Sequence, residues 1–129
     1  PVELHVQSSG GALMPALAIV DTICRSPVPV HSFVEGFAAS AATLMTVVCA
    51  VRYAHPNSLM LIHQMSGGAE GTLAQVGDRV DGMRTIDKLV KNVYLMHTRI
   101  ASDDLEELMK HDVWMTASEC MHKGIVDEI

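Results

Sequence analysis

Aromatic side chains and clustered positive charge are both scarce in this chain. Phe, Trp and Tyr make up 4% of the residues, and 9 Lys and Arg face 15 Asp and Glu, which leaves a net charge of −6. Proteins that bind nucleic acid present grouped basic side chains and stacking aromatic rings. Anionic membrane surfaces also attract basic runs. We therefore expect no nucleic-acid partner and no membrane partner.

A hydrophobic run long enough to cross a membrane is also missing. The longest nearly apolar stretch spans residues 36–51 and contains Ser40, Thr43 and Thr46. A membrane-spanning helix needs about 20 apolar residues, so we expect a buried helix over residues 38–50 instead. The first residues lack the charged-then-apolar pattern of a secretion signal.

Cysteine is limited to Cys24, Cys49 and Cys120, which lie far apart in apolar surroundings. An odd number of cysteines cannot pair completely within one chain, and no C-x-x-C occurs. We interpret all three as reduced core residues, which predicts a cytoplasmic or equivalent reducing compartment. The 7 histidines show no metal-ligand spacing, so we expect neither a metal nor another cofactor.

What the chain does contain is an alternation of strand and helix patterns, which predicts an α/β fold with a largely parallel sheet. Its 129 residues, 49% of them hydrophobic, suit one domain spanning residues 1–129. Strands are expected over residues 2–7, 30–34, 52–54, 59–62 and 125–129. Helices are expected over residues 12–25, 38–50 and 74–101, with shorter helices capped by Ser102 and Thr116.

The expected helix over residues 74–101 has an apolar stripe that is longer than a domain of this size needs. Its steps of three and four residues are typical of a packing seam. The stripe consists of Val76, Val80, Met83, Ile86, Val90, Val93, Met96 and Ile100. A helix that projects from the domain and packs against another subunit would explain this length.

Three polar side chains lie at the ends of expected elements. Ser40 begins the buried helix, His63 ends an apolar strand, and Asp112 precedes a short apolar run. Taken singly, each has an ordinary interpretation, as a helix cap, a hydrogen-bonded core histidine and a solvated carboxylate. Taken together, they could supply a nucleophile, its base and an orienting carboxylate, with the Gly10-Gly11 turn adding a backbone donor. Spacing alone leaves this choice open, because such triads are defined by geometry.

At these residues the chain resembles the ClpP family of serine peptidases, over almost its whole length. SSGG at residues 8–11 is similar to the family's N-S-P-G-G turn, and GFAAS at 36–40 to its G-x-A-A-S nucleophile motif. PNSLMLIHQ at 56–64 is similar to P-N-S-x-x-M-I-H-Q, and DVWMTA at 112–117 to D-x-F-[ML]-[ST]-A. GIVD at 124–127 is similar to the closing G-L-[IV]-D. The motifs follow in the family's order at matching intervals.

The resemblance implies a ClpP/crotonase-like fold with a projecting handle helix and strand, at about residues 64–101. It implies that Ser40 is the nucleophile, His63 the general base and Asp112 the orienting carboxylate. The backbone N–H groups of Gly11 and Ala41 would form the oxyanion hole. The substrate would be an unfolded polypeptide, bound as an added strand. The residues expected to contact it are Gly10, Met65, Ser66, Gly67 and Gly68.

The implied assembly is a pair of stacked heptameric rings, a tetradecamer, supplied with substrate by a hexameric AAA+ ATPase. Lys110 and His111 stand where the family commonly has an Asp-Arg pair that reaches across the ring interface. Because histidine titrates near neutrality, we expect a weaker and more pH-sensitive contact between rings. Three further departures are Ser9 for proline, Ala41 for methionine and Met65 for proline. We also expect the family's N-terminal segment to be missing.

Two other functions remain open from the sequence. One is a catalytically weak ClpP-like structural subunit of a mixed ring, although such subunits usually lose a triad residue. The other is a crotonase-fold enzyme acting on an acyl thioester, which shares paired backbone donors but needs no Ser-His-Asp set.

Overall fold

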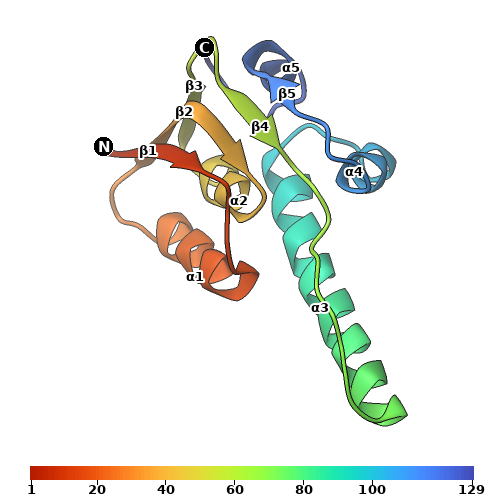
Figure 1. Cartoon of the computed structure of the whole chain (residues 1–129). Helices are drawn as coiled ribbons and strands as arrows, with labels where there is room; N and C mark the ends of the chain where they lie inside the picture. The colour runs from red at the N-terminus through yellow and green to blue at the C-terminus, as the bar shows by residue number, and fades with distance from the viewer.

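The computed structural model describes all 129 residues, from Pro1 to Ile129. Five strands and five helices alternate for most of the chain (Figure 1). In order they are β1 (Val2–Ser8), α1 (Leu13–Cys24), β2 (Val30–Ala39), α2 (Ala41–Val47), β3 (Val51–Ala54), β4 (Leu59–Leu61), α3 (Leu73–His97), α4 (Ser102–Met109), β5 (Met115–Thr116) and α5 (Ala117–His122).

Strand β2 is the centre of the sheet. It pairs in parallel with β1 on one side, and on the other side with β3 along its first half and β4 along its second half. Only β5 runs antiparallel, against β4. The prediction of an α/β fold with a largely parallel sheet is therefore confirmed.

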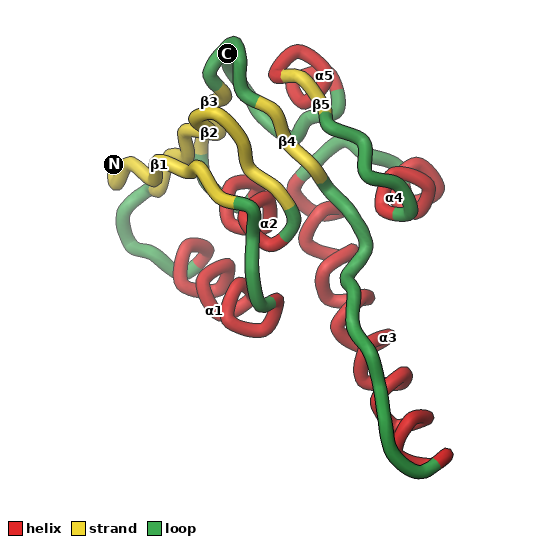
Figure 2. The backbone as a smooth tube through the Cα atoms, viewed as in Figure 1, coloured by secondary structure: helices red, strands yellow, loops and turns green.

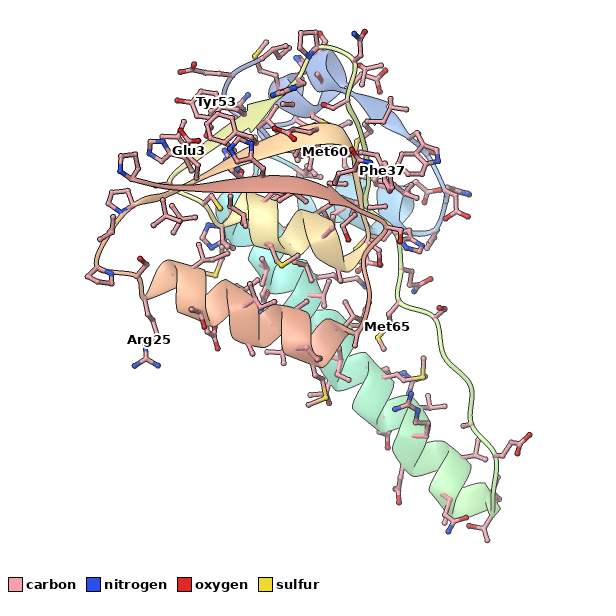
Figure 3. The ribbon with its side chains drawn as sticks, turned by 60° about the vertical axis from the view of Figure 1, so that its left-hand side comes forward. Glu3, Arg25, Phe37, Tyr53, Met60 and Met65 are labelled. Atoms are coloured by element: carbon pink, nitrogen blue, oxygen red, sulfur yellow. The ribbon has the colours of Figure 1, made fainter.

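Helices α1 and α2 cover one face of this sheet (Figure 1). In β1, the side chain of Val6 enters the core beneath, whereas Glu3 and His5 are exposed, as the two-residue period of a strand requires. Glu3 and Tyr53 lie on the face opposite these helices (Figure 3). Six of the seven residues of α2 are buried, because this helix has no charged side chain and lies between the sheet, α1 and α3.

Helix α3 projects from the rest of the molecule, and residues 62–72 run alongside it (Figure 2). The helix begins with a capping box in which the Thr72 side chain accepts from Gln75 N–H and the Gln75 side chain accepts from Thr72 N–H. Only Val90 and Tyr94 of α3 are buried. No helix of the chain combines the length and apolar composition needed to cross a membrane.

The prediction of a helix over residues 38–50 was wrong at both ends. Ala38 and Ala39 continue β2 and pair with Met60 and Leu61 of β4, so β2 extends five residues beyond the predicted end of 34. The helix itself covers only Ala41–Val47. A buried strand and a buried helix are both continuous apolar runs, so periodicity did not separate them.

Other expectations also need correction. Residues 125–129 form no strand, and only an isolated bridge joins Glu128 to Tyr53. Ser102 is inside α4, which Ala101 caps. Helix α3 ends at His97 rather than at residue 101, because Thr98 is extended. Cys24 is exposed rather than part of the core; Cys49 and Cys120 are buried.

Candidate active site

Ser40 occupies a strained turn between β2 and α2. It is the one non-glycine residue with a positive φ, at 57°, and such a conformation persists only where neighbouring contacts hold it. Ser40 N–H donates to the Leu61 carbonyl (2.8 Å), and the Ser40 carbonyl accepts from Thr43 N–H (2.9 Å). Ser40 takes the N-cap position of α2 without making a side-chain cap bond. Its hydroxyl is therefore not committed to capping the helix.

The Gly10-Gly11 turn packs directly against this serine. A Cβ atom at Gly10 would lie 2.9 Å from Ser40 Cβ and 2.8 Å from the Ala39 carbonyl oxygen, so no larger residue fits. Gly10 also has a φ of 100°. A Cβ at Gly11 would meet no atom within 4 Å, so the turn is open on that side.

His63 and Asp112 are brought together by the only antiparallel pairing of the sheet. Met60 of β4 is opposite Met115 of β5, and the same register continued for three residues brings His63 opposite Asp112. Beyond them, Gln64 N–H donates to the Met109 carbonyl (2.6 Å). The two segments are thus tied on both sides of the pair.

The resulting contact joins His63 Nδ1 and Asp112 Oδ1 at 3.5 Å. The histidine side chain is 33% exposed and the carboxylate 78% exposed. Because Nδ1 faces the carboxylate, Nε2 is the ring nitrogen left for another partner. The structure contains no hydrogen bond between Ser40 and His63; such bonds are often long before substrate binds.

A hollow of about 450 Å³ joins five of the ten expected site residues, and Asp112 is not among them. Ser40, His63, Gly11, Met65 and Ser66 all line it, and Met65 points from its segment toward α1 (Figure 3). Gly10 and Ala41 instead line a smaller hollow next to it. Gly67 and Gly68 line a third hollow of about 370 Å³ between residues 64–69 and α3.

The segment expected to bind an extended substrate is not a strand in this structure. Residues 62–70 have no regular secondary structure and lie along α3 (Figure 2). A Cβ at Gly67 would lie 3.1 Å from Met83 Cε. The glycine therefore lets this segment lie close to the apolar stripe of α3.

Several residues around Ser40 were not identified from the sequence. Leu13, Met14 and Pro15 of α1 and Arg79 and Ile86 of α3 also line the hollow of Ser40. Ile86 belongs to the apolar stripe, which is a sequence signal for its orientation. Nothing in the sequence separates Arg79 from the other charged residues of α3. No group of three or more His, Cys, Asp or Glu side chains is arranged to hold a metal ion.

These features define a class: an α/β protein with a strained serine at the carboxyl edge of its sheet and a histidine–carboxylate pair beside it. Comparison with known sequences agrees with that class. A sequence model of the Clp protease family matches residues 1–129. The chain therefore belongs to the Clp protease family.

One curated relative is the ATP-dependent Clp protease proteolytic subunit 3 of Streptomyces coelicolor. It is 32% identical to this chain over 130 aligned positions, which cover 99% of the chain. The chain spans 60% of the length of that relative.

Proposed function

We propose that this chain is a serine endopeptidase subunit that hydrolyses peptide bonds through Ser40, His63 and Asp112. One observation carries the proposal: Ser40, in its strained turn, shares a hollow with His63, whose other side faces Asp112. A strained residue at a pocket needs a reason to be retained, and presenting a nucleophile is such a reason. Membership of the Clp protease family supports the same chemistry.

In this mechanism Ser40 Oγ attacks the carbonyl carbon of the scissile bond while His63 Nε2 removes its proton. Asp112 accepts a hydrogen bond from Nδ1–H, which fixes the tautomer and stabilises the imidazolium that forms. His63 then gives the proton to the departing amine. Water then attacks the acyl carbon while His63 Nε2 takes its proton. His63 returns this proton to Ser40 Oγ as the acyl group leaves, which restores the Ser40 hydroxyl.

The negative charge that develops on the substrate oxygen needs backbone donors. Gly11 N–H and Ala41 N–H are the proposed pair. Ala41 is the first residue of α2, and the first N–H groups of a helix have no partner within it. Donors that are already in position contribute strongly to acyl transfer.

The proposed substrate is an unfolded polypeptide bound along residues 66–71, with contacts to Gly10, Met65, Ser66, Gly67 and Gly68. The proposed unit is one domain, residues 1–129, whose handle at about residues 64–101 joins heptameric rings into a tetradecamer. A AAA+ ATPase would supply substrate in a cytoplasmic or equivalent reducing compartment. The uncovered apolar residues of α3 support an assembled state.

The decisive experiment combines cleavage of a fluorogenic peptide with labelling by a fluorophosphonate. Ser40→Ala should lower kcat by a factor on the order of 10⁵ to 10⁶ and abolish labelling, with unchanged unfolding. Ser118→Ala is a matched control, since it removes the same oxygen from an exposed serine of α5 that lies outside the hollow. Retained cleavage in Ser40→Ala would refute the assignment.

A catalytically weak structural subunit of a mixed ring is the second candidate. The observation in its favour is the long, exposed contact between His63 and Asp112, which would orient the imidazole loosely. Labelling separates the two candidates: a structural subunit would form rings of normal mass, but its Ser40 would not react.

A further inference from the structure

Two buried hydroxyl groups, one of Thr43 and one of Tyr94, connect to the backbone of Ser40 through consecutive hydrogen bonds. Thr43 Oγ1 lies 2.7 Å from the Ser40 carbonyl oxygen and 2.7 Å from Tyr94 Oη. Both side chains are fully buried. Thr43 belongs to α2 and Tyr94 to α3, so these two hydrogen bonds join the turn at Ser40 to the projecting helix α3.

The direction of the two hydrogen bonds follows from a count of protons. A carbonyl oxygen can only accept, and a hydroxyl has one proton. Thr43 must therefore donate to the Ser40 carbonyl, which leaves its oxygen to accept from Tyr94. Burial raises the pKa of Tyr94, so the phenol keeps the proton that it donates.

The carbonyl that accepts from Thr43 belongs to the same peptide group as one donor of the proposed oxyanion hole. The Ser40 carbonyl and Ala41 N–H are opposite ends of one peptide group, which is planar and, like all peptide bonds here, not cis. Holding the carbonyl therefore holds the direction of Ala41 N–H. Hydrogen bonds in series also polarise one another, which makes that N–H a stronger donor.

We propose that Thr43 and Tyr94 are positioning residues that orient and polarise the Ser40–Ala41 peptide for transition-state binding, an inference that rests on the proposed function. Tyr94 lies on the same helix as Ile86 and Arg79, which line the hollow. The position of α3 is thereby linked to the donor that the developing oxyanion needs.

The test uses Tyr94→Phe and Thr43→Val, which each remove the hydroxyl at nearly constant volume, and Thr43→Ser, which keeps it. Complete loss of an oxyanion donor costs about 10²- to 10³-fold in kcat. Weakening one should cost less, about 3- to 30-fold, with KM unchanged because substrate in the ground state has no oxyanion. Thr43→Ser should recover most of the rate.

A peptide boronate, which forms a tetrahedral anion on the serine, gives a readout that a purely structural role would not change. Its affinity should fall in proportion to kcat/KM, while affinity for the cleaved peptide product stays constant. Two controls are matched: Tyr53→Phe removes a phenol on the opposite face (Figure 3), and Thr46→Val removes a buried hydroxyl that donates to the Thr43 carbonyl.

Each outcome decides the inference. Equal boronate affinity and kcat in Tyr94→Phe and Tyr53→Phe would overturn it and leave the proposed function intact. Absence of Ser40 labelling in the unaltered chain would overturn both proposals together. If Tyr94→Phe does not fold, the comparison of Thr43→Val with Thr43→Ser addresses the same bond, and equal kcat in those two variants would likewise overturn the inference.

Discussion

Helix α2 contains no charged residue, whereas α3 carries an apolar stripe among charged residues, and the two helices lie in opposite environments. Six of the seven residues of α2 are buried. Of the 25 residues of α3, only Val90 and Tyr94 are, both in its last third. Apolar side chains of α3 such as Val80 and Met96 remain exposed.

The difference shows that the apolar residues of the two helices have different partners. Those of α2 are covered within the chain, where they hold the turn of Ser40 in place. Those in the first half of α3 are covered only in part, by the segment that contains Gly67. A large apolar surface without a partner in its own chain usually marks an interaction site. Changes in α2 should therefore affect the stability of the subunit, whereas changes on the stripe of α3 should affect assembly.

The largest effect is expected from shortening a buried leucine of α2. Leu44 has an exposed fraction of 0%, whereas Leu73 at the start of α3 is 91% exposed. Leu44→Ala should lower the free energy of unfolding by about 2–5 kcal/mol, because it removes buried contacts and leaves a cavity. Leu73→Ala should change it by less than about 0.5 kcal/mol. Urea unfolding of both variants measures the contrast.

Equal losses in the two leucine variants would show that α3 is as well packed as α2. The conclusion that α3 needs a partner would then fail. A small loss in both would point instead to a loosely packed core, since well-packed interiors do not tolerate the loss of a buried side chain.

A charge on the exposed stripe of α3 should break assembly without unfolding the subunit. We expect Val80→Glu to shift the main species in native mass spectrometry from paired rings to smaller assemblies, because the new carboxylate would lose its water in the contact. Unfolding at low concentration should change by less than about 0.5 kcal/mol. Lys88→Glu, at an exposed polar position of α3, is the control for added charge.

The same spectra test the expectation of a weak ring contact. Lys110 and His111 follow the end of α4, and their side chains lie 3.9 and 3.3 Å from the Glu107 carboxylate of that helix. Paired rings that persist unchanged at nanomolar concentration between pH 6 and 8 would contradict that expectation. Identical spectra for Val80→Glu and Lys88→Glu would remove the stripe from the assembly surface.

Much of the fold was predictable because its pattern is local. Alternation of strands and helices predicted the parallel sheet, and the capping pattern at Thr116 predicted α5, where Thr116 accepts from Glu119 N–H. The end of β2 was not predictable, since the alanines on both sides of Ser40 are small apolar residues that fit a strand or a helix. The two-residue β5 is too short to have a period.

For the candidate site, the motifs identified Ser40, His63 and Asp112, but only the structure relates them in space. Their catalytic roles remain predictions. The bond between Thr43 and Tyr94 joins residues 51 positions apart, and neither residue type is unusual in a core. Cys24 was misplaced because an apolar neighbourhood in sequence says nothing about which side of a helix faces solvent.

A smaller effect is expected where the end of the chain is attached to the body. The Arg52 side chain donates to Asp127 Oδ1 (2.7 Å) and Oδ2 (3.1 Å), and these hydrogen bonds hold the pKa of Asp127 below its ordinary value of 3.8. A carboxyl with a depressed pKa contributes stability above its ordinary pKa, and this contribution disappears as pH falls through the folded value.

Asp127→Asn should therefore lower the free energy of unfolding at pH 7 by about 1–2 kcal/mol, and the difference from the unaltered chain should shrink as pH falls below 3.8. Urea titrations from pH 2.5 to 7 measure this. Asp78→Asn, at an exposed position of α3, should show no such dependence. A pH-independent loss in Asp127→Asn would mean that packing, rather than charge, attaches the end of the chain.

The smallest effect is expected from stiffening the exposed part of α3. A Cβ at Gly77 would meet no atom within 4 Å, and glycine inside a helix costs about 0.5–1 kcal/mol relative to alanine. If the first half of α3 is as independent of the core as its exposure indicates, Gly77→Ala should slow amide exchange over residues 73–80 by about 2- to 5-fold. Exchange in α2 and global urea unfolding should not change, because the buried core keeps the same contacts. Slower exchange in both helices would show instead that α3 and α2 unfold together. The exposure of the apolar stripe would then not indicate a missing partner.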